Sequence, residues 1–197
     1  LTSSVLLAQP AGFNYDESKV PQYQLPNPLL MLDGTRVKSA RQWNQERRAE
    51  VFKLFETEMY GRSPERPEDL HFETLEMADD ALDGTAVRKQ VRVFFSANKD
   101  GPSMDILIYH PRTSRPVPLF VGLNFQGNHT VHADPAIHIT ESWVRERGSA
   151  SDNRATEMGR GTSASRWDIN SILDRGYGLA TIYYGDIDPD FHDEFKN

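Results

Sequence analysis

The sequence predicts an α/β protein whose mixed sheet begins with antiparallel strands and continues with parallel ones. Residues 86–96 and 104–110 resemble two strands joined by a tight turn at 98–101, which is typical of an antiparallel hairpin. Further on, an apolar strand at 117–124, a helix and a second apolar strand at 178–184 follow in that order. Such a strand–helix–strand unit places its two strands parallel.

The antiparallel part is indicated by alternation along 86–96. One face is apolar and the other polar, with Val87, Val91, Val93 and Phe95 opposite Arg88, Gln90 and Arg92. In the following strand, Ile106 and Ile108 are expected to point inward. A weaker strand is predicted at 71–77, and 13–28 is predicted to be an extended arm because it holds three prolines.

A helix is predicted to begin after Ser39, because Gln42 stands at capping-box spacing. Its apolar stripe comprises Trp43, Val51, Leu54, Phe55 and Met59, Gly61 ends it, and Arg47 belongs to the solvated side.

A second helix is expected to be capped by Ser165, with Asp168 three residues on. It ends at Arg175-Gly176, and its predicted buried stripe comprises Trp167, Ile169, Ile172 and Leu173.

The strand at 117–124 shows no polar alternation until Asn124, as expected of a strand buried on both faces. Its last residue and the four that follow are Asn124, Phe125, Gln126, Gly127 and Asn128. In open α/β sheets, ligands bind at the carboxyl ends of the strands, so these five residues are the candidate substrate-binding residues. A turn that merely ends the strand accounts for the same pattern equally well.

Two motifs carry a family resemblance: GLNFQGNHT at Gly122–Thr130 and RGYGLATIYYGDIDPD at Arg175–Asp190. They resemble the bacterial glucuronoyl esterases, a carbohydrate esterase family often described as acetyl xylan esterases. Asn14–Glu17 and Phe55–Arg62 add weaker support. The resemblance runs from about residue 13 to the end. It implies that 13–197 is the incomplete amino-terminal portion of one α/β-hydrolase domain, a three-layer sandwich.

The resemblance also implies a function: hydrolysis, through a serine nucleophile, of the glucuronoyl esters that link xylan to lignin alcohols. The expected partners are glucuronoxylan or its lignin esters and the missing carboxy-terminal part of the same domain. An acetyl or other acyl esterase of the same fold, or a carbohydrate-binding module without chemistry, stays open as an alternative.

The catalytic triad is not expected within this chain. The Gly-x-Ser-x-Gly turn that presents the nucleophile in α/β hydrolases does not occur in the sequence. The resemblance places the nucleophile, the acid and the histidine beyond Asn197. A carboxyl group on the sugar predicts contacts with Lys or Arg side chains, but no such residue can be identified from the sequence alone.

The composition of the chain excludes several classes of binding partner and cofactor. A net charge of -7 argues against nucleic acid or an anionic membrane as a partner. The sequence contains no cysteine, which removes thiolate chemistry, and no cofactor is expected. Residues 1–12 are interpreted as a signal remnant or a disordered terminus, and the resemblance favours a secreted or periplasmic protein.

Two polar clusters are candidate metal sites. The acids Asp186, Asp188, Asp190, Asp193 and Glu194 lack the calcium-loop pattern, so a turn stabilised by Asp side chains is the preferred interpretation. For His129, His132 and His138, solvated or locally hydrogen-bonded side chains are favoured over zinc.

A long polar loop is predicted at 130–162. Its second half, Arg147–Arg160, could border a substrate cleft or be a mobile insertion.

Overall fold

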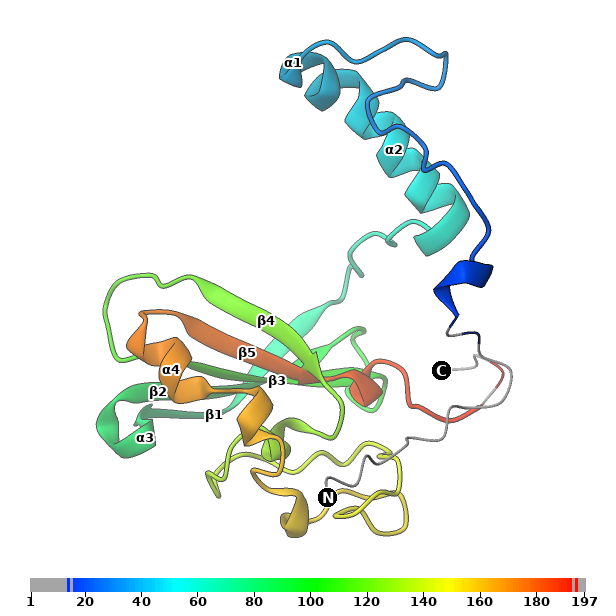
Figure 1. The fold of residues 1–197 in the computed structure, drawn as a ribbon. Coiled ribbons are helices and arrows are strands. Elements are labelled where there is room, and N and C mark those ends of the chain that lie inside the picture. Colours follow the sequence, from blue (N-terminus) through cyan, green and yellow to red (C-terminus); the bar gives the residue numbers. More distant parts are fainter. Residues whose placement is uncertain (1–13, 15, 193, 195–197) are drawn as a thin grey trace, which may run out of the picture. The chain divides into compact units, whose positions relative to one another are not determined.

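The computed structural model describes residues 14, 16–192 and 194, so the expectations for residues 1–12 lie outside it. The chain divides into two compact units, Leu1–Pro64 and Glu65–Asn197, which contain the elements labelled in Figure 1. The expectation that 13–197 is one incomplete domain stays a prediction. None of the described helices is both long and apolar enough to span a bilayer.

The first unit contains a short 3-10 turn, η1 (Glu17–Lys19), and a helical run of four segments. These are α1 (Ala40–Gln42), the π-helical η2 (Trp43–Arg47), α2 (Arg48–Phe55) and the π-helical η3 (Glu56–Tyr60). The predicted caps are present. Ser39 accepts a hydrogen bond from the Gln42 N–H, and Gly61 ends the run with a φ of 74°.

Arg47 was wrongly predicted to be solvated. It is buried, because its Nε donates to the Pro28 carbonyl at 3.0 Å and its guanidinium pairs with Glu50 at 2.9 Å. These contacts tie the extended arm to the helix. Leu54, Phe55 and Met59 of the apolar stripe are exposed.

The second unit is built on a five-stranded sheet. Its strands are β1 (His71–Asp80), β2 (Ala86–Phe94), β3 (Ser103–Pro111), β4 (Leu119–Asn124) and β5 (Gly178–Tyr183), in the spatial order β1-β2-β3-β5-β4. The three pairs β1–β2, β2–β3 and β3–β5 are antiparallel, and β4 pairs parallel with β5. The predicted mixed sheet is therefore confirmed. The short helix α3 (Ala81–Gly84) joins β1 to β2.

The strand β4 is not buried on both faces, contrary to the prediction. Because β5 lies between β3 and β4, β4 is the edge of the sheet among the described residues. Leu119, Val121 and Leu123 are exposed on it, Val121 by 66%. The strand that is buried along its whole length is β5.

The inward residues of β3 are Leu107 and Tyr109, whereas Ile106 and Ile108 are only partly buried. The register explains this correction, because Leu107 lies beside Gln90 and Tyr109 beside Arg88. That face is covered by α4 (Ile169–Asp174) and by residues 131–137, with which Leu107 and Tyr109 form the core.

Helix α4 begins three residues later than predicted. Its cap is Asp168, which accepts from the Ser171 N–H at 3.2 Å, while Ser165 lies in the preceding 3-10 turn η6 (Ala164–Arg166). The predicted stripe is confirmed: Ile169 and Leu173 are buried, and Trp167 and Ile172 pack against them. Three further 3-10 turns, η4 (Asn128–Thr130), η5 (Glu157–Gly159) and η7 (Tyr184–Asp186), lie in the connecting segments.

Candidate functional site

The carboxyl end of β4 is a tightly hydrogen-bonded turn. The Oδ1 of Asn124 accepts from the Gly127 N–H at 2.8 Å, and its Nδ2 donates to Asn128 Oδ1 at 2.7 Å. Asn128 Oδ1 also accepts from the Thr181 hydroxyl at 2.9 Å, and its Nδ2 donates to the Asp105 carbonyl at 2.9 Å. Both Asn side chains are buried and fully occupied in holding the turn to β3 and β5.

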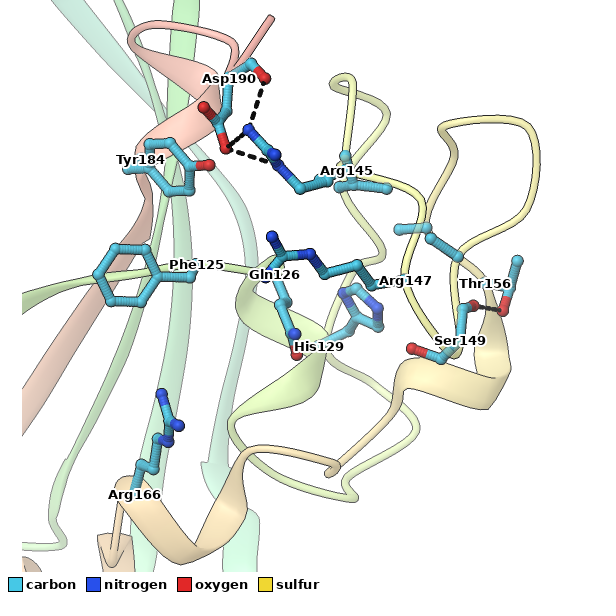
Figure 2. Close-up of a pocket in the computed structure, with 13 residues that line it drawn as sticks. Phe125, Gln126, His129, Arg145, Arg147, Ser149, Thr156, Arg166, Tyr184 and Asp190 are labelled. Atoms are coloured by element: carbon cyan, nitrogen blue, oxygen red, sulfur yellow. Dashed lines mark hydrogen bonds and ion pairs between the residues drawn. The ribbon is translucent and has the colours of Figure 1, made fainter. Parts of the chain in front are cut away.

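Phe125 and Gln126, which lie between these two residues, face a pocket of about 350 Å³ (Figure 2). The Phe125 ring is 69% exposed and meets Tyr184 edge-on, with 5.5 Å between ring centroids. Of the five predicted substrate-binding residues, two therefore line the pocket. Asn124, Gly127 and Asn128 lie behind it.

The opposite wall of the pocket comes from the long loop at 130–162. Its lining residues there are Val144, Arg145, Arg147, Ser149, Ala150, Ala155 and Thr156. The wall is held by its own polar contacts, because Asn153 Nδ2 donates to the Val144 carbonyl at 3.1 Å and Thr156 donates to the Ser149 carbonyl. The second half of the loop thus borders a cleft, one of the two roles considered for it.

Charges in the pocket are mainly positive. Arg145 pairs with Asp190 at 2.6 Å, and Tyr184, followed by Arg145, holds the pKa of Asp190 below its usual range. Burial raises the pKa of Tyr184 itself to about 12. Arg147 and Arg166 also line the pocket, and neither pairs with an acid among the described residues. Arg147 belongs to the segment that was predicted either to border a cleft or to be a mobile insertion, but no pattern in the sequence marked either arginine as a pocket residue, because both stand in segments without periodicity.

His129 forms part of the pocket lining and is 1% exposed as a residue. Its Nδ1 is buried with no hydrogen-bond partner, so the expectation of a solvated or hydrogen-bonded ring is wrong for this residue. Burial, reinforced by the Arg160 charge, lowers the pKa of His129 to about 4. The ring lies between Gly127 and Gly159, where an added Cβ would come within 2.8 Å of its nitrogens.

The acidic segment after β5 serves to hold the loop. Asp186 accepts from the Ser142 hydroxyl at 2.6 Å, the Thr140 hydroxyl at 3.1 Å and the Asp105 N–H at 3.1 Å. Burial raises the pKa of this carboxyl. Within residues 14, 16–192 and 194, no group of three His, Asp or Glu side chains could hold a metal ion. Asp193 lies outside the described residues.

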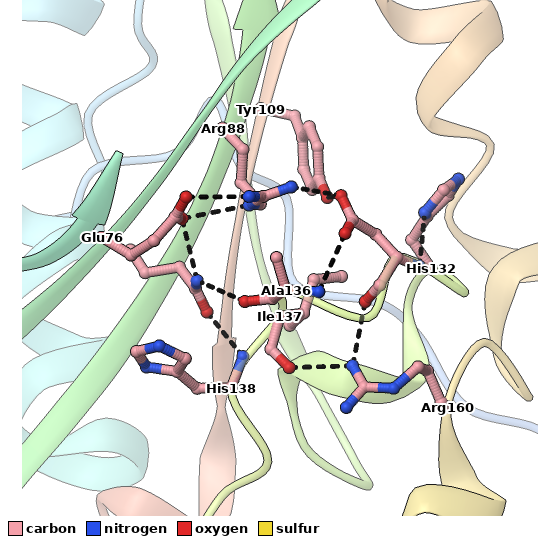
Figure 3. Close-up of polar contacts among 10 residues, drawn as sticks. Glu76, Arg88, Tyr109, His132, Ala136, Ile137, His138 and Arg160 are labelled. Carbon is pink, nitrogen blue, oxygen red and sulfur yellow. Dashed lines mark hydrogen bonds and ion pairs between the residues drawn. The ribbon is translucent and has the colours of Figure 1, made fainter. Parts of the chain in front are cut away.

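A second polar network fixes the start of the loop to the sheet (Figure 3). Buried Arg88 donates to Glu76 at 2.8 Å and to Asp134, and Tyr109 donates to Asp134 at 3.0 Å. Hydrogen bonds from Arg88 hold the pKa of Glu76 below its usual range.

Gln90 extends this network by donating to the Ala136 carbonyl at 2.9 Å and accepting from the His138 N–H at 2.8 Å. Arg160 completes it from the other end of the loop, donating to the Asp134 and Ile137 carbonyls at 2.9 and 2.8 Å. The sheet thereby positions both ends of the pocket wall.

The chain is similar to known carbohydrate esterases in sequence and in fold. No protein-family model matches the chain. It is 53% identical over 188 residues to carbohydrate esterase MZ0003, from an unknown prokaryotic organism, covering 94% of this chain and 43% of that protein. A promiscuous CE15 esterase from a marine bacterial metagenome superposes with a TM-score of 0.83 at 53% identity, covering 91% of this chain and 45% of that one. A glucuronoyl esterase from Solibacter usitatus gives a TM-score of 0.82 at 44% identity, covering 91% and 45%.

The chain matches the amino-terminal part of CE15 glucuronoyl esterases. The resemblance drawn from the two sequence motifs is thereby confirmed, as is an α/β-hydrolase-like fold of which this chain is one part. The chain spans less than half the length of these CE15 relatives.

Proposed function

We propose that this chain is the amino-terminal part of an enzyme that hydrolyses glucuronoyl esters, the bonds that join glucuronoxylan to lignin alcohols. The observation that carries the proposal is the superposition on a glucuronoyl esterase at 44% identity over 91% of the chain. The pocket supports it, because it lies at the carboxyl end of β4, and ligands of open α/β sheets bind at the carboxyl ends of strands.

The pocket geometry supports a sugar ligand. Phe125 presents an exposed ring, and Tyr184 packs against its edge so that the ring is held in place. An aromatic face of this kind packs on the apolar face of a pyranose. In α/β hydrolases, the loop that follows an early central strand lies beside the reacting carbonyl, and here that loop is the turn after Asn124.

The chemistry proposed is acyl transfer. A serine attacks the ester carbonyl, a histidine accepts the serine proton and later returns one to the leaving alcohol, and a carboxylate orients the histidine. We assign these three groups to sequence beyond Asn197. Phe125 and Gln126 of this chain then contact the substrate, while the catalytic triad comes from the carboxy-terminal part.

The same proposal accounts for the open edge of the sheet. An apolar edge strand such as β4 presents unpaired backbone groups and exposed side chains. We propose that the carboxy-terminal part of the same domain pairs with β4 and covers Leu119, Val121 and Leu123. A secreted or periplasmic location also belongs to the proposal, and cell fractionation of the native host tests it.

The test of function uses the full-length protein and two substrates, the methyl ester of glucuronic acid and acetylated xylan. A glucuronoyl esterase releases methanol from the first with a much higher kcat/KM than it releases acetate from the second. Preference for acetylated xylan would contradict the proposal in favour of an acetyl esterase. Saturable glycan binding without hydrolysis of either substrate would instead indicate a binding module.

A further inference from the structure

The pocket beside Phe125 is unlike the rest of the molecule in its charge. The whole chain carries a net charge of -7, yet the pocket lining holds three arginines and one aspartate. Arg145 is neutralised by Asp190, with which it makes a 2.6 Å ion pair. Arg147 and Arg166 remain, so the lining has an excess of positive charge.

These two arginines differ from those that the fold itself uses. Arg88, Arg92 and Arg160 are each engaged by an acid and help to hold strands or loops together. Among the described residues, neither Arg147 nor Arg166 makes an ion pair or a side-chain hydrogen bond, and both are exposed. Their guanidinium groups are therefore available to a ligand.

The two side chains approach the pocket from different segments. Arg147 extends from the long loop toward Gln126, and Arg166 rises from η6 toward the side of the pocket where Phe125 lies (Figure 2). A guanidinium has the planar pair of N–H donors that a carboxylate accepts in bidentate fashion. Two such groups lining one concave surface concentrate the local field on an anion.

We propose that Arg147 and Arg166 form a subsite for the carboxylate of a free uronic acid, with its sugar ring against Phe125. The ligand class rests on the proposed function. The esterified sugar acid is neutral, whereas hydrolysis leaves a carboxylate, so the subsite distinguishes the product acid and unesterified uronates from the ester. The exposed Phe125 ring favours a sugar acid over a bare inorganic anion, which would not use it.

The test is a binding measurement on the full-length enzyme by titration calorimetry. The probes are sodium glucuronate and glucuronamide, which has the same ring and a neutral amide in place of the carboxylate. We expect glucuronate to bind about tenfold more tightly at low ionic strength, and added salt to reduce that preference. Equal affinity for the two probes would overturn the proposal.

Variants of the two arginines show whether the preference arises at this pocket. Arg147→Gln and Arg166→Gln are each expected to weaken glucuronate binding by about threefold, and by about tenfold together, and to leave glucuronamide unchanged. Arg147→Lys retains the charge and is expected to restore part of the affinity. The matched control is the double variant Arg112→Gln with Arg175→Gln, which removes the same charge from exposed positions outside the pocket lining. Unchanged glucuronate affinity in the pocket variants, or an equal loss in the control, would overturn the proposal.

Turnover assays separate this inference from the proposed function. If the enzyme hydrolyses glucuronoyl esters but the arginine variants bind glucuronate like the wild type, the subsite is wrong and the function stands. If it hydrolyses no glucuronoyl ester yet binds glucuronate through these arginines, the subsite stands alone. Competitive inhibition of turnover by glucuronate is expected, because the ester and the free acid place their sugar rings against the same Phe125, and binding without competition would overturn this placement.

Discussion

The side-chain amide of Asn124 donates to Asn128 Oδ1 at 2.7 Å, and the turn between them turns Phe125 and Gln126 outward to the pocket. The two asparagines are buried, whereas Phe125 is 69% exposed. One short polar contact thus links the carboxyl end of β4 to the geometry of the candidate site.

Replacing Asn128 is expected to cost more stability than any neighbouring change in this turn. Asn128→Leu keeps the approximate size but leaves the Asn124 amide, the Thr181 hydroxyl and the Asp105 carbonyl without their partner. We expect a loss of about 3 kcal/mol in the free energy of unfolding, measured by urea denaturation of the full-length protein. The control, Gln126→Ala, removes a pocket-lining side chain and is expected to change stability by less than about 1 kcal/mol. Equal losses for the two variants would contradict the structural role assigned to Asn128.

Arg88 is expected to be critical for stability although it does not line the pocket. Arg88→Met leaves the half-buried carboxylates of Glu76 and Asp134 without their cation, which costs about 3 kcal/mol, the low end for a buried pair. Arg92→Met breaks the more exposed pair with Asp105 and should cost about 1 kcal/mol or less. Urea titrations of both variants measure the difference, and a similar small loss for each would show that the Arg88 network contributes little.

His129 is expected to make the fold sensitive to mild acid. Its pKa is about 4 in the folded chain and about 6.5 when unfolded, so the unfolded state binds the proton first as pH falls. The contribution of neutral His129 to the free energy of unfolding is fully present above about pH 6.5. It is lost at about 1 kcal/mol per pH unit as the pH falls toward 4.

The comparison of wild type with His129→Gln isolates this effect, because both carry the same carboxyl groups. Burial raises the pKa of Asp186, which contributes to the pH dependence in the opposite direction. Denaturant titrations at several pH values should give a shallower slope for the variant between pH 6.5 and 4. Parallel pH profiles would show that His129 is not buried in its neutral form.

The exposed edge of the sheet predicts that residues 1–197 expressed alone are poorly soluble or incompletely folded. Leu119, Phe120, Val121 and Leu123 are all exposed on β4, so we expect aggregation or a molten state that binds a hydrophobic dye. Val121→Lys with Leu123→Thr should raise the soluble fraction. A soluble wild-type segment with a sharp cooperative melt would argue that β4 needs no further partner.

The strands and helices could be predicted because their signals are local. Alternation gave β2, the capping serine and Gly61 bounded the first helix, and the apolar run at Gly178–Tyr183 gave β5. The exposure of β4 could not be predicted, because it depends on β5 lying between β3 and β4, and the spatial order of strands is not a local property.

The site was predictable only in part for the same reason. Phe125 and Gln126 were found because ligands gather at the carboxyl ends of strands. The burial of Arg88 depends on Asp134, 46 residues away, and the pocket wall comes from a loop without periodicity. Arg147 and Arg166 could be recognised only after the fold had brought them to one pocket.

The most direct test of the central claim is the kcat/KM of full-length Phe125→Ala on the methyl ester of glucuronic acid, measured together with its melting temperature. The account predicts a fall of about tenfold or more in kcat/KM at an unchanged melting temperature, because the exposed ring contacts the sugar and supports no core. Wild-type activity in a stable Phe125→Ala protein would contradict the assignment of this pocket to the substrate.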